Sequence, residues 1–472
     1  MYNDYASLRS DLNSGKVTAI DVVKYYLENI EKGKHLNAFL SFFEQEALDI
    51  AKDVDEKIKN GTAGRLAGMV VAVKDVLSLK GKRLTCGSKI LENFEALYTS
   101  TAVQRLIDED AIIIGKTNCD EFAMGSSNEN SAYGVVKNPH DPTKVPGGSS
   151  GGSAVAVAAD MCLVSLGTDT GGSVRQPAAF CGVVGFKPTY GRVSRYGLTA
   201  FASSFDTIGP FAKNVEDIAR VLEAMAGWDE NDSTCVKTEV ENYSQNIDSI
   251  KEKEVKIGIV EDLSDGLQEE IKKSLKAVID CLKTKGFSVK SVKLPYLKYS
   301  IQTYYILTTA EASSNLARYD GARYGHRAGN SKSTEDMYVN SRTEGFGTEV
   351  KRRIMLGTYV LSAGYYDAYY KKAQRVRRLI KEDFENTFKE VDLILIPTTP
   401  TTAFKIGEKI DDPLSMYLND IFTTSSNLSG NPAISIPVGK DKNGLPIGLQ
   451  VIGKDFDEQG VLKLANYIMS NC

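Results

Sequence analysis

The stretch Val145-Pro-Gly-Gly-Ser-Ser-Gly-Gly-Ser-Ala154 opens the part of the sequence that decides the fold. Residues 145–210 contain seven charged residues in 66, less than half the density of the whole chain, which is 25% charged. Apolar runs such as Val155-Ala-Val157 and Val183-Val184 interrupt the glycines and serines, so a flexible linker does not explain this composition. We therefore expect this window to be buried, with its glycines serving the backbone geometry.

The sequence before this window predicts an α/β fold. Met69-Val-Val-Ala-Val73 and Ala111-Ile-Ile-Ile114 are short, apolar, β-branched runs, which are typical of buried strands. Between them, Val103, Leu106 and Ile107 have the spacing of one helix face. The order strand, helix, strand is the repeating unit of an α/β sheet.

The remaining segments extend this pattern in both directions. The first 65 residues are expected to be helical, with Thr18 capping a helix that begins near Ala19 and a second helix over 43–60 that stops at Gly61. Farther along, the sequence predicts strands over 255–260, 287–293, 393–396 and 433–438, and helices over 267–285 and 348–390, the last interrupted at Gly364.

Composition excludes several classes of protein. The chain has 472 residues, and its 57 Lys+Arg and 61 Asp+Glu give a formal charge of −4, which offers no electrostatic footprint for holding nucleic acid alone. No run approaches the roughly 18–20 apolar residues of a membrane helix, and the first residues show no apolar signal core. We expect a soluble cytoplasmic protein without a membrane partner.

The seven cysteines and three histidines predict no metal site. The cysteines are odd in number and form no Cys-x-x-Cys pair, and the histidines are isolated from one another. We expect the cysteines to be buried, reduced thiols, as is usual in a reducing compartment.

The glycine-serine cluster offers a possible nucleophile. Residues 147–151 formally satisfy the G-x-S-x-G elbow of α/β-hydrolases, which requires a preceding strand and a histidine base. Residues 143–146 make a poor strand, and none of His35, His140 and His326 has a setting that suggests a base. A serine nucleophile here is therefore expected to use a different base.

Lys74 is the alternative base, because it ends the apolar strand over residues 69–73. A lysine accepts a proton at pH 7 only if burial lowers its pKa from about 10.4 to about 7–8. Asp75 follows it, but neighbouring strand residues point to opposite faces, so this carboxylate need not pair with Lys74. Taken alone, Lys74 is more consistent with a surface lysine at a strand end.

Three motifs together resemble the amidase signature family: Lys74, the segment 145–154 and the segment 167–177. The resemblance implies one large α/β/α domain with a central mixed β-sheet, spanning residues 1–472. Within it we expect N-terminal helices over 1–65, a signature core with the catalytic residues over 66–225, and the remaining strands, helices and substrate-recognition elements over 226–472.

The same resemblance implies a Ser–cis-Ser–Lys triad. In this triad Ser173 is the acylated nucleophile and Lys74 is the terminal base. Ser149 follows a cis peptide and is the bridging serine between Ser173 and Lys74. The backbone N–H groups of the glycine loop are expected to form the oxyanion hole, from Thr170, Gly171 and Gly172.

Over essentially the whole chain, the sequence is similar to one branch of this family, the glutaminase (A) subunits of tRNA-dependent amidotransferases. The similarity is carried by residues 129–134, 318–325, 350–357, 362–370, 416–421 and 444–450. It implies a heterotrimer with B and C subunits. In this complex, the B subunit uses ATP and Mg²⁺ to convert Glu-tRNA(Gln) to Gln-tRNA(Gln), or Asp-tRNA(Asn) to Asn-tRNA(Asn). This chain itself is expected to need no cofactor.

The resemblance implies L-glutamine as the substrate. Arg353 would bind its carboxylate and Asp420 its ammonium group, with Tyr304 and the Met124 backbone lining the pocket. Two alternatives remain open: a stand-alone amidase acting on another small amide, and a non-catalytic scaffold with the same fold. The basic run 371–378 is either a solvated helix face or a tRNA contact, and the negative overall charge favours tRNA binding mainly through the B subunit.

Overall fold

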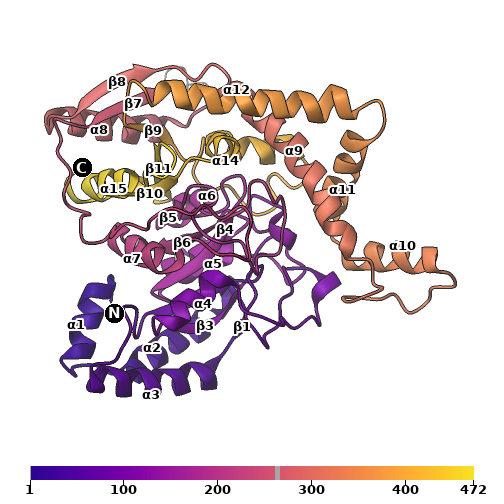
Figure 1. Ribbon diagram of the computed structural model, residues 1–472, viewed down its shortest axis with the longest axis horizontal. Coiled ribbons are helices and arrows are strands. Elements are labelled where there is room, and N and C mark those ends of the chain that lie inside the picture. Colours follow the sequence, from indigo (N-terminus) through magenta and orange to yellow (C-terminus); the bar gives the residue numbers. More distant parts are fainter. Residues whose placement is uncertain (1, 261–265) are drawn as a thin grey trace.

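The computed structural model describes residues 2–260 and 266–472. Within them, eleven strands form one sheet in the order β1-β3-β2-β4-β6-β5-β10-β11-β9-β7-β8 (Figure 1). Its parallel pairs are β2 with β3 and β4, and β7 with β8 and β9, while the other neighbours are antiparallel. The strands are β1 (Phe39–Phe42), β2 (Val70–Lys74), β3 (Ile112–Thr117), β4 (Val164–Asp169), β5 (Val184–Lys187), β6 (Thr207–Ala212), β7 (Lys256–Val260), β8 (Ser288–Val292), β9 (Leu393–Pro397), β10 (Ala433–Lys440) and β11 (Pro446–Gly453).

Helices cover both faces of this sheet, which confirms the α/β class with a mixed sheet. In Figure 1, α7, α8 and α15 lie on one side of the strands, and α5, α6 and α14 on the other. The helices are α1 (Tyr5–Asn13), α2 (Ala19–Lys32), α3 (Glu44–Asn60), α4 (Thr101–Asp108), α5 (Gly151–Ala158), α6 (Arg175–Cys181), α7 (Val215–Met225), α8 (Glu269–Thr284), α9 (Ser300–Asn315), α10 (Thr334–Gly345), α11 (Thr348–Leu361), α12 (Lys372–Thr387), α13 (Pro413–Tyr417), α14 (Thr424–Ser429) and α15 (Glu458–Asn471).

Local sequence explains where several elements begin and end. Helix α2 begins with a reciprocal capping box between Thr18 and Asp21, as its N-cap residue predicts. Helix α3 ends at Gly61, whose backbone is left-handed, with a φ of +69°. The helical pattern over 348–390 is interrupted at Gly364, also left-handed, which separates α11 from α12.

The window 145–210 is buried over most of its length, as its composition predicts. It supplies β4, α5, α6, β5 and β6, which occupy the middle of the sheet and one face of it. Gly152 shows why small residues are required: a Cβ added there would lie 2.3 Å from the Asn118 carbonyl oxygen.

Two expectations from the sequence are wrong. The first 65 residues are not wholly helical, because Phe39–Phe42 forms β1 and pairs with the edge of β3. The cysteines are not all reduced: Cys281 and Cys472 form a disulfide that joins α8 to the end of α15. The other five cysteines are buried and free, as expected.

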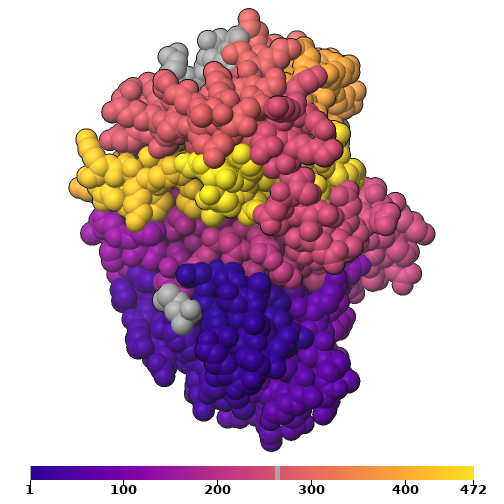
Figure 2. Space-filling model, turned by 90° about the vertical axis from the view of Figure 1, so that its left-hand side faces the viewer, coloured from indigo at the N-terminus to yellow at the C-terminus, as the bar shows by residue number. Residues whose placement is uncertain are grey.

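The chain is arranged in layers that follow the sheet order. Figure 2 shows the yellow C-terminal residues as a belt between the indigo and violet N-terminal half and the salmon and orange segments. This belt corresponds to β10, β11 and α15, and the two strands stand between β5 and β9 in the sheet. Over the described residues, no helix combines the length and apolarity that crossing a bilayer requires.

Candidate active site

Lys74 lies at the end of β2 and is completely buried. Its Nζ donates to three hydroxyl oxygens: Ser149 Oγ at 2.7 Å, Ser150 Oγ at 2.9 Å and Thr168 Oγ1 at 2.8 Å. Ser149 and Ser150 stand immediately before α5, and Thr168 lies on the neighbouring strand β4. The structure therefore brings Lys74 and Ser149, two of the expected triad residues, into direct contact.

Burial changes the charge state of this lysine. Removal from water lowers the pKa of Lys74 to about 8, although Asp120 and Asp169 oppose the shift. Asp75 does not pair with it, because its Oδ1 lies 2.8 Å from the Nζ of Lys116. The alternating directions of strand residues predicted this separation, and the value is close to the range in which Lys74 accepts a proton.

The peptide between Gly148 and Ser149 is cis. The Gly148 N–H donates to Gln176 Oε1 at 2.9 Å, and the Ser149 carbonyl oxygen accepts from the Asp120 N–H at 3.2 Å. These bonds fix the backbone on both sides of the peptide. They hold Ser149 in place against Lys74.

Ser173 lies in the turn between β4 and α6, next to the cis-peptide segment. Its carbonyl oxygen accepts a hydrogen bond of 3.3 Å from the Ser150 N–H, which joins the two loops. Ser173 is 8% exposed, whereas Ser149 and Lys74 are fully enclosed. Of the three expected triad residues, Ser173 is therefore the one that a substrate can reach.

An internal ion pair braces this turn. Arg175 donates from Nε to Asp169 Oδ2 at 3.0 Å and from Nη2 to Oδ1 at 2.9 Å, and both side chains are fully buried. Burial alone would raise the pKa of Asp169, but the guanidinium outweighs it and lowers the pKa to about 2. The pair is structural, since it holds the loop rather than facing the substrate.

One of the three expected oxyanion donors is already engaged. The Gly172 N–H donates to Asp169 Oδ1 at 2.9 Å. No hydrogen bond among the described residues uses the N–H groups of Thr170, Gly171 or Ser173, so these remain available to a developing oxyanion. This finding favours Thr170 and Gly171 over Gly172.

The turn is packed tightly against later parts of the chain. A Cβ at Gly171 would lie 2.4 Å from Tyr304 Cζ, and one at Gly172 would lie 2.2 Å from Thr423 Oγ1. Thr423 also donates from Oγ1 to the Gly171 carbonyl oxygen at 2.7 Å and from its N–H to the Asp420 carbonyl at 3.1 Å. The expected substrate residues Tyr304 and Asp420 thus stand beside the glycine turn.

The other expected substrate residues belong to the same region. Arg353 on α11 is 2% exposed. Burial raises the pKa of Asp420 to about 7, although the hydrogen bond from Ser126 and the positive charge of Arg353 oppose the shift. Ser126 Oγ donates to Asp420 Oδ2 at 2.5 Å. Met124, two residues earlier, is buried and uses its N–H within the chain, in a bond to the Glu121 carbonyl at 2.9 Å.

Sequence reasoning missed several residues of this region. Ser150 and Thr168 share the Lys74 Nζ, and Gln176 connects Gly148 to Ser126 through its two amide atoms. The first two lie inside the quoted motifs, where polar residues between glycines were a usable signal. Ser126 lies in a loop with no periodicity, and only the fold shows its role.

The histidine alternative finds no support. His140 Nε2 lies 2.9 Å from the Cys181 carbonyl oxygen, and His326 Nε2 lies 2.8 Å from Glu344. Among the described residues, the hydrogen bond of Ser149 Oγ is to Lys74, and no histidine contacts it. Over residues 2–260 and 266–472, no group of three or more His, Cys, Asp or Glu side chains is placed to hold a metal ion.

The basic run over 371–378 is largely accounted for by nearby groups. Lys371 pairs with Asp367, and Arg378 with Glu382 and Glu385. Arg377 turns inward and donates from Nε to the Leu428 carbonyl at 3.0 Å. These contacts match a solvated, internally paired helix face.

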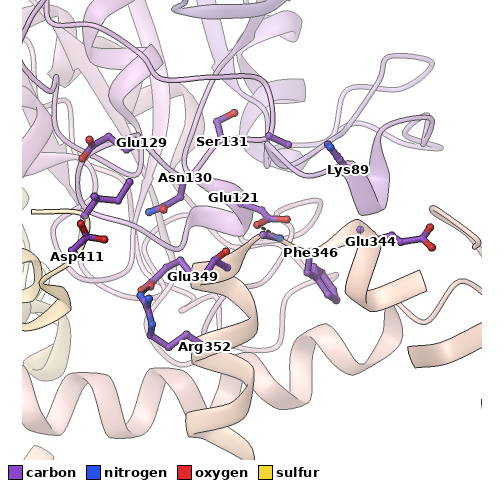
Figure 3. Close-up of a pocket in the computed structure, with 15 residues that line it drawn as sticks. Lys89, Glu121, Glu129, Asn130, Ser131, Glu344, Phe346, Glu349, Arg352 and Asp411 are labelled. Atoms are coloured by element: carbon purple, nitrogen blue, oxygen red, sulfur yellow. Dashed lines mark hydrogen bonds and ion pairs between the residues drawn. The ribbon is translucent and has the colours of Figure 1, made fainter. Parts of the chain in front are cut away.

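Two cavities lie near the start of α11, and Arg353 lines only the smaller one. The smaller, about 40 Å³, is lined by Ser127, Arg353, Lys409 and Tyr417 among others. The larger, about 450 Å³, lies at the start of α11 and shares Glu349 and Arg352 with the smaller one (Figure 3). Neither cavity is lined by Lys74, Ser149 or Ser173.

Known proteins are similar to this chain over nearly its whole length. The amidase family model matches residues 21–462. The A subunit of glutamyl-tRNA(Gln) amidotransferase from Chlorobium phaeobacteroides is 54% identical over 466 residues, covering 98% of each chain. The corresponding protein of Koribacter versatilis is 55% identical over 463 residues, covering 98% of this chain and 96% of that one.

Solved structures show the same fold. The A subunit of glutamyl-tRNA(Gln) amidotransferase from Thermotoga maritima has a TM-score of 0.80 at 43% identity, covering 96% of this chain and 92% of that chain. A peptide amidase from Stenotrophomonas maltophilia has a TM-score of 0.85 at 28% identity, covering 99% of this chain and 96% of that chain.

Proposed function

The chain belongs to the amidase family, and from this premise we propose that it is the glutamine-hydrolysing A subunit of a tRNA-dependent amidotransferase. The identity of more than half over nearly the full length of the named relatives supports this branch of the family. The observation that carries the chemistry is the enclosed Lys74, bonded to Ser149 and with its pKa lowered to about 8.

In the proposed reaction, neutral Lys74 accepts a proton from Ser149, which accepts the proton of Ser173 as its Oγ attacks the amide carbonyl of glutamine. A new bond forms between Ser173 Oγ and the carbonyl carbon. The N–H groups of the turn stabilise the oxyanion, and one such donor is typically worth about 3–4 kcal/mol.

Collapse of this intermediate breaks the carbon–nitrogen bond. The proton held on Lys74 returns through Ser149 to the leaving nitrogen, which departs as ammonia, and a γ-glutamyl ester remains on Ser173. Water then attacks the ester by the same relay, releasing glutamate and restoring the serine. The sum of the two halves is glutamine plus water giving glutamate plus ammonia.

The fate of the ammonia defines the partners. We propose that it passes to a B subunit, which activates Glu-tRNA(Gln), Asp-tRNA(Asn) or both with ATP and Mg²⁺, and that a C subunit completes a cytoplasmic heterotrimer. The relatives are named for glutamyl-tRNA(Gln), which supports the first of these substrates. The formal charge of −4 and the internally paired basic run support tRNA binding through the B subunit.

An ammonia-release assay tests this proposal. Glutamine hydrolysis is measured for the chain alone and for the chain with B and C subunits, with and without misacylated tRNA and ATP. We expect low activity alone and stimulation by tRNA and ATP in the complex. Activity on small amides that is indifferent to the partners would instead indicate a stand-alone amidase, and no hydrolysis of any amide would indicate a scaffold.

A further inference from the structure

The guanidinium of Arg353 is surrounded by aromatic rings. Its Cζ lies 5.6 Å from the Phe201 ring centroid, 5.3 Å from that of Tyr305 and 5.6 Å from that of Tyr417. Tyr305 and Tyr417 stack on one another with centroids 3.8 Å apart. Aromatic rings attract a cation through their faces but do not fix its rotation. A further group must therefore set the direction in which the forked N–H groups of the Arg353 guanidinium point.

Glu349 supplies that direction. Its Oε1 accepts from Arg353 Nε at 2.8 Å, one helical turn along α11, and both side chains are buried. Among the described residues, the Nη1 and Nη2 groups of Arg353 take part in no hydrogen bond. A carboxylate that binds Nε from the side leaves the two terminal nitrogens free for a second, bidentate carboxylate.

Glu349 also connects α11 to the segment that carries Asp420. The Tyr417 hydroxyl donates to the same Oε1 at 3.0 Å, and Tyr417 ends α13 three residues before Asp420. Arg352 binds the other carboxylate oxygen, and Figure 3 shows it beside Glu349 at the wall of the larger cavity. One carboxylate thus links the helix that bears the cation to the turn that bears the anion.

We propose that Glu349, through Arg353 and the Tyr417 hydroxyl, is a positioning residue that makes the site specific for amides bearing an α-carboxylate and an α-ammonium group. The inference rests on the proposed function, since it assigns the glutamine carboxylate to Arg353. Glu349 touches no reacting atom. It sets where the fork of Arg353 points and how far that fork lies from Asp420.

The test measures kcat and KM in the assembled complex for L-glutamine and for propionamide, an amide without either charged group. Glu349→Gln keeps the size and one hydrogen-bond acceptor but removes the charge. We expect KM for glutamine to rise about 10-fold, equivalent to about 1.4 kcal/mol of binding, with kcat changed much less. Propionamide hydrolysis should keep its rate, and Tyr417→Phe should give a smaller change of the same kind.

Glu382→Gln is the matched control. It also breaks a Glu–Arg pair four residues apart on a helix, the one between Glu382 Oε1 and Arg378 Nε at 2.8 Å, but on the exposed face of α12. We expect its KM for glutamine to be that of the wild type. A second control places Glu349→Gln in an Arg353→Ala background, where it should add no further rise because its route of action is gone.

Several outcomes would contradict the inference. An equal loss for glutamine and propionamide, or a full additional effect in the Arg353→Ala background, would show that Glu349 acts on the fold or independently of Arg353. If the wild-type complex hydrolyses glutamine, and Glu349→Gln and Tyr417→Phe keep the wild-type KM for glutamine, only this inference is wrong. If it hydrolyses propionamide but not glutamine, the proposed function is wrong, and this inference falls with it.

Discussion

At the scale of single residues, the site depends on a lysine that the fold has removed from water without giving it a counter-ion. Lys74 is surrounded by three hydroxyl oxygens, which accept its hydrogen bonds but carry no charge. The carboxylate next to it in sequence, Asp75, is neutralised by Lys116 instead. This arrangement keeps the neutral form of Lys74 accessible, since desolvation disfavours the charged form.

The pH dependence of hydrolysis should report this lysine. Lys74 must be neutral to accept a proton and burial lowers its pKa to about 8, so the rate should rise with pH through about 8 and fall about tenfold per unit below it. The measurement is kcat/KM against pH, with propionamide as substrate so that groups binding glutamine do not contribute. A profile that is flat between pH 6 and 9 would contradict this assignment.

Removal of the proposed nucleophile gives a second prediction. Ser173→Ala should lower kcat for glutamine by roughly 10⁶-fold, the loss typical when a triad nucleophile is deleted, without a change in Tm. His326→Ala is the control and should leave turnover unchanged, because His326 pairs with Glu344 at the surface. Acyl-enzyme trapped on Ser149 in the Ser173→Ala variant would show that the nucleophile is wrongly assigned.

Arg353→Ala tests the substrate. Loss of a charge-assisted contact worth about 1.5–3 kcal/mol should raise KM for glutamine roughly 10- to 200-fold. Propionamide hydrolysis should not respond, and added ammonium should restore tRNA amidation in the complex because it bypasses this site. Equal losses for both amides would show that Arg353 supports the fold only.

At the scale of elements, the turn between β4 and α6 is positioned by its contact with α9. Gly171→Ala would place a methyl group 2.4 Å from Tyr304 Cζ, so the turn or the ring must move. We expect kcat/KM to fall by about 10²-fold, because a displacement near 1 Å at reacting groups has this effect. Gly329→Ala, where a Cβ meets nothing within 4 Å, is the matched control and should keep full activity.

The elements that the sequence predicts well are those with a local signal. Helix α2 carries its own capping box, and β2 is a continuous apolar run, so both appear in the structure within a residue of their predicted starts. The strand β1 was missed because its four residues lack burial periodicity and gain their pairing from β3, some seventy residues later. Tertiary contact decides such a segment, not propensity.

The candidate site divides in the same way. Lys74, Ser149 and Ser173 belong to motifs whose residue types indicate a serine nucleophile and a lysine base. The structure places Lys74 and Ser149 in contact. Gly172 illustrates the limit: its position in the loop suggested an oxyanion donor, yet its N–H donates to Asp169. The direction of each group within a turn follows from packing, which a motif does not encode.

At the scale of the whole molecule, one covalent bond joins distant parts of the chain. The Cys281–Cys472 disulfide closes a loop of 191 residues. Such a bond typically adds about 2–4 kcal/mol. For a chain of 472 residues this corresponds to a Tm shift of about 3 °C, so adding dithiothreitol to the oxidised protein should lower its Tm by that amount.

Cys472→Ser provides the control for that measurement. This variant should melt at the temperature of the reduced wild type and show no response to dithiothreitol, because Cys281 loses its partner and the other five cysteines are free thiols. If the wild-type Tm is insensitive to dithiothreitol, the bond contributes nothing to stability.

The hydrogen bonds of Arg175 tie the Ser173 turn to residues that are made late in the synthesis of the chain. Besides Asp169, its guanidinium is held by Ser426, Asn427 and Gln450, which are made more than 250 residues later. At about 5–20 residues per second, a ribosome needs roughly 20–75 s to pass from Lys74 to Gln450. A nascent chain therefore carries Ser173 and Lys74 long before all the bonds that hold Arg175 in the Ser173 turn can form.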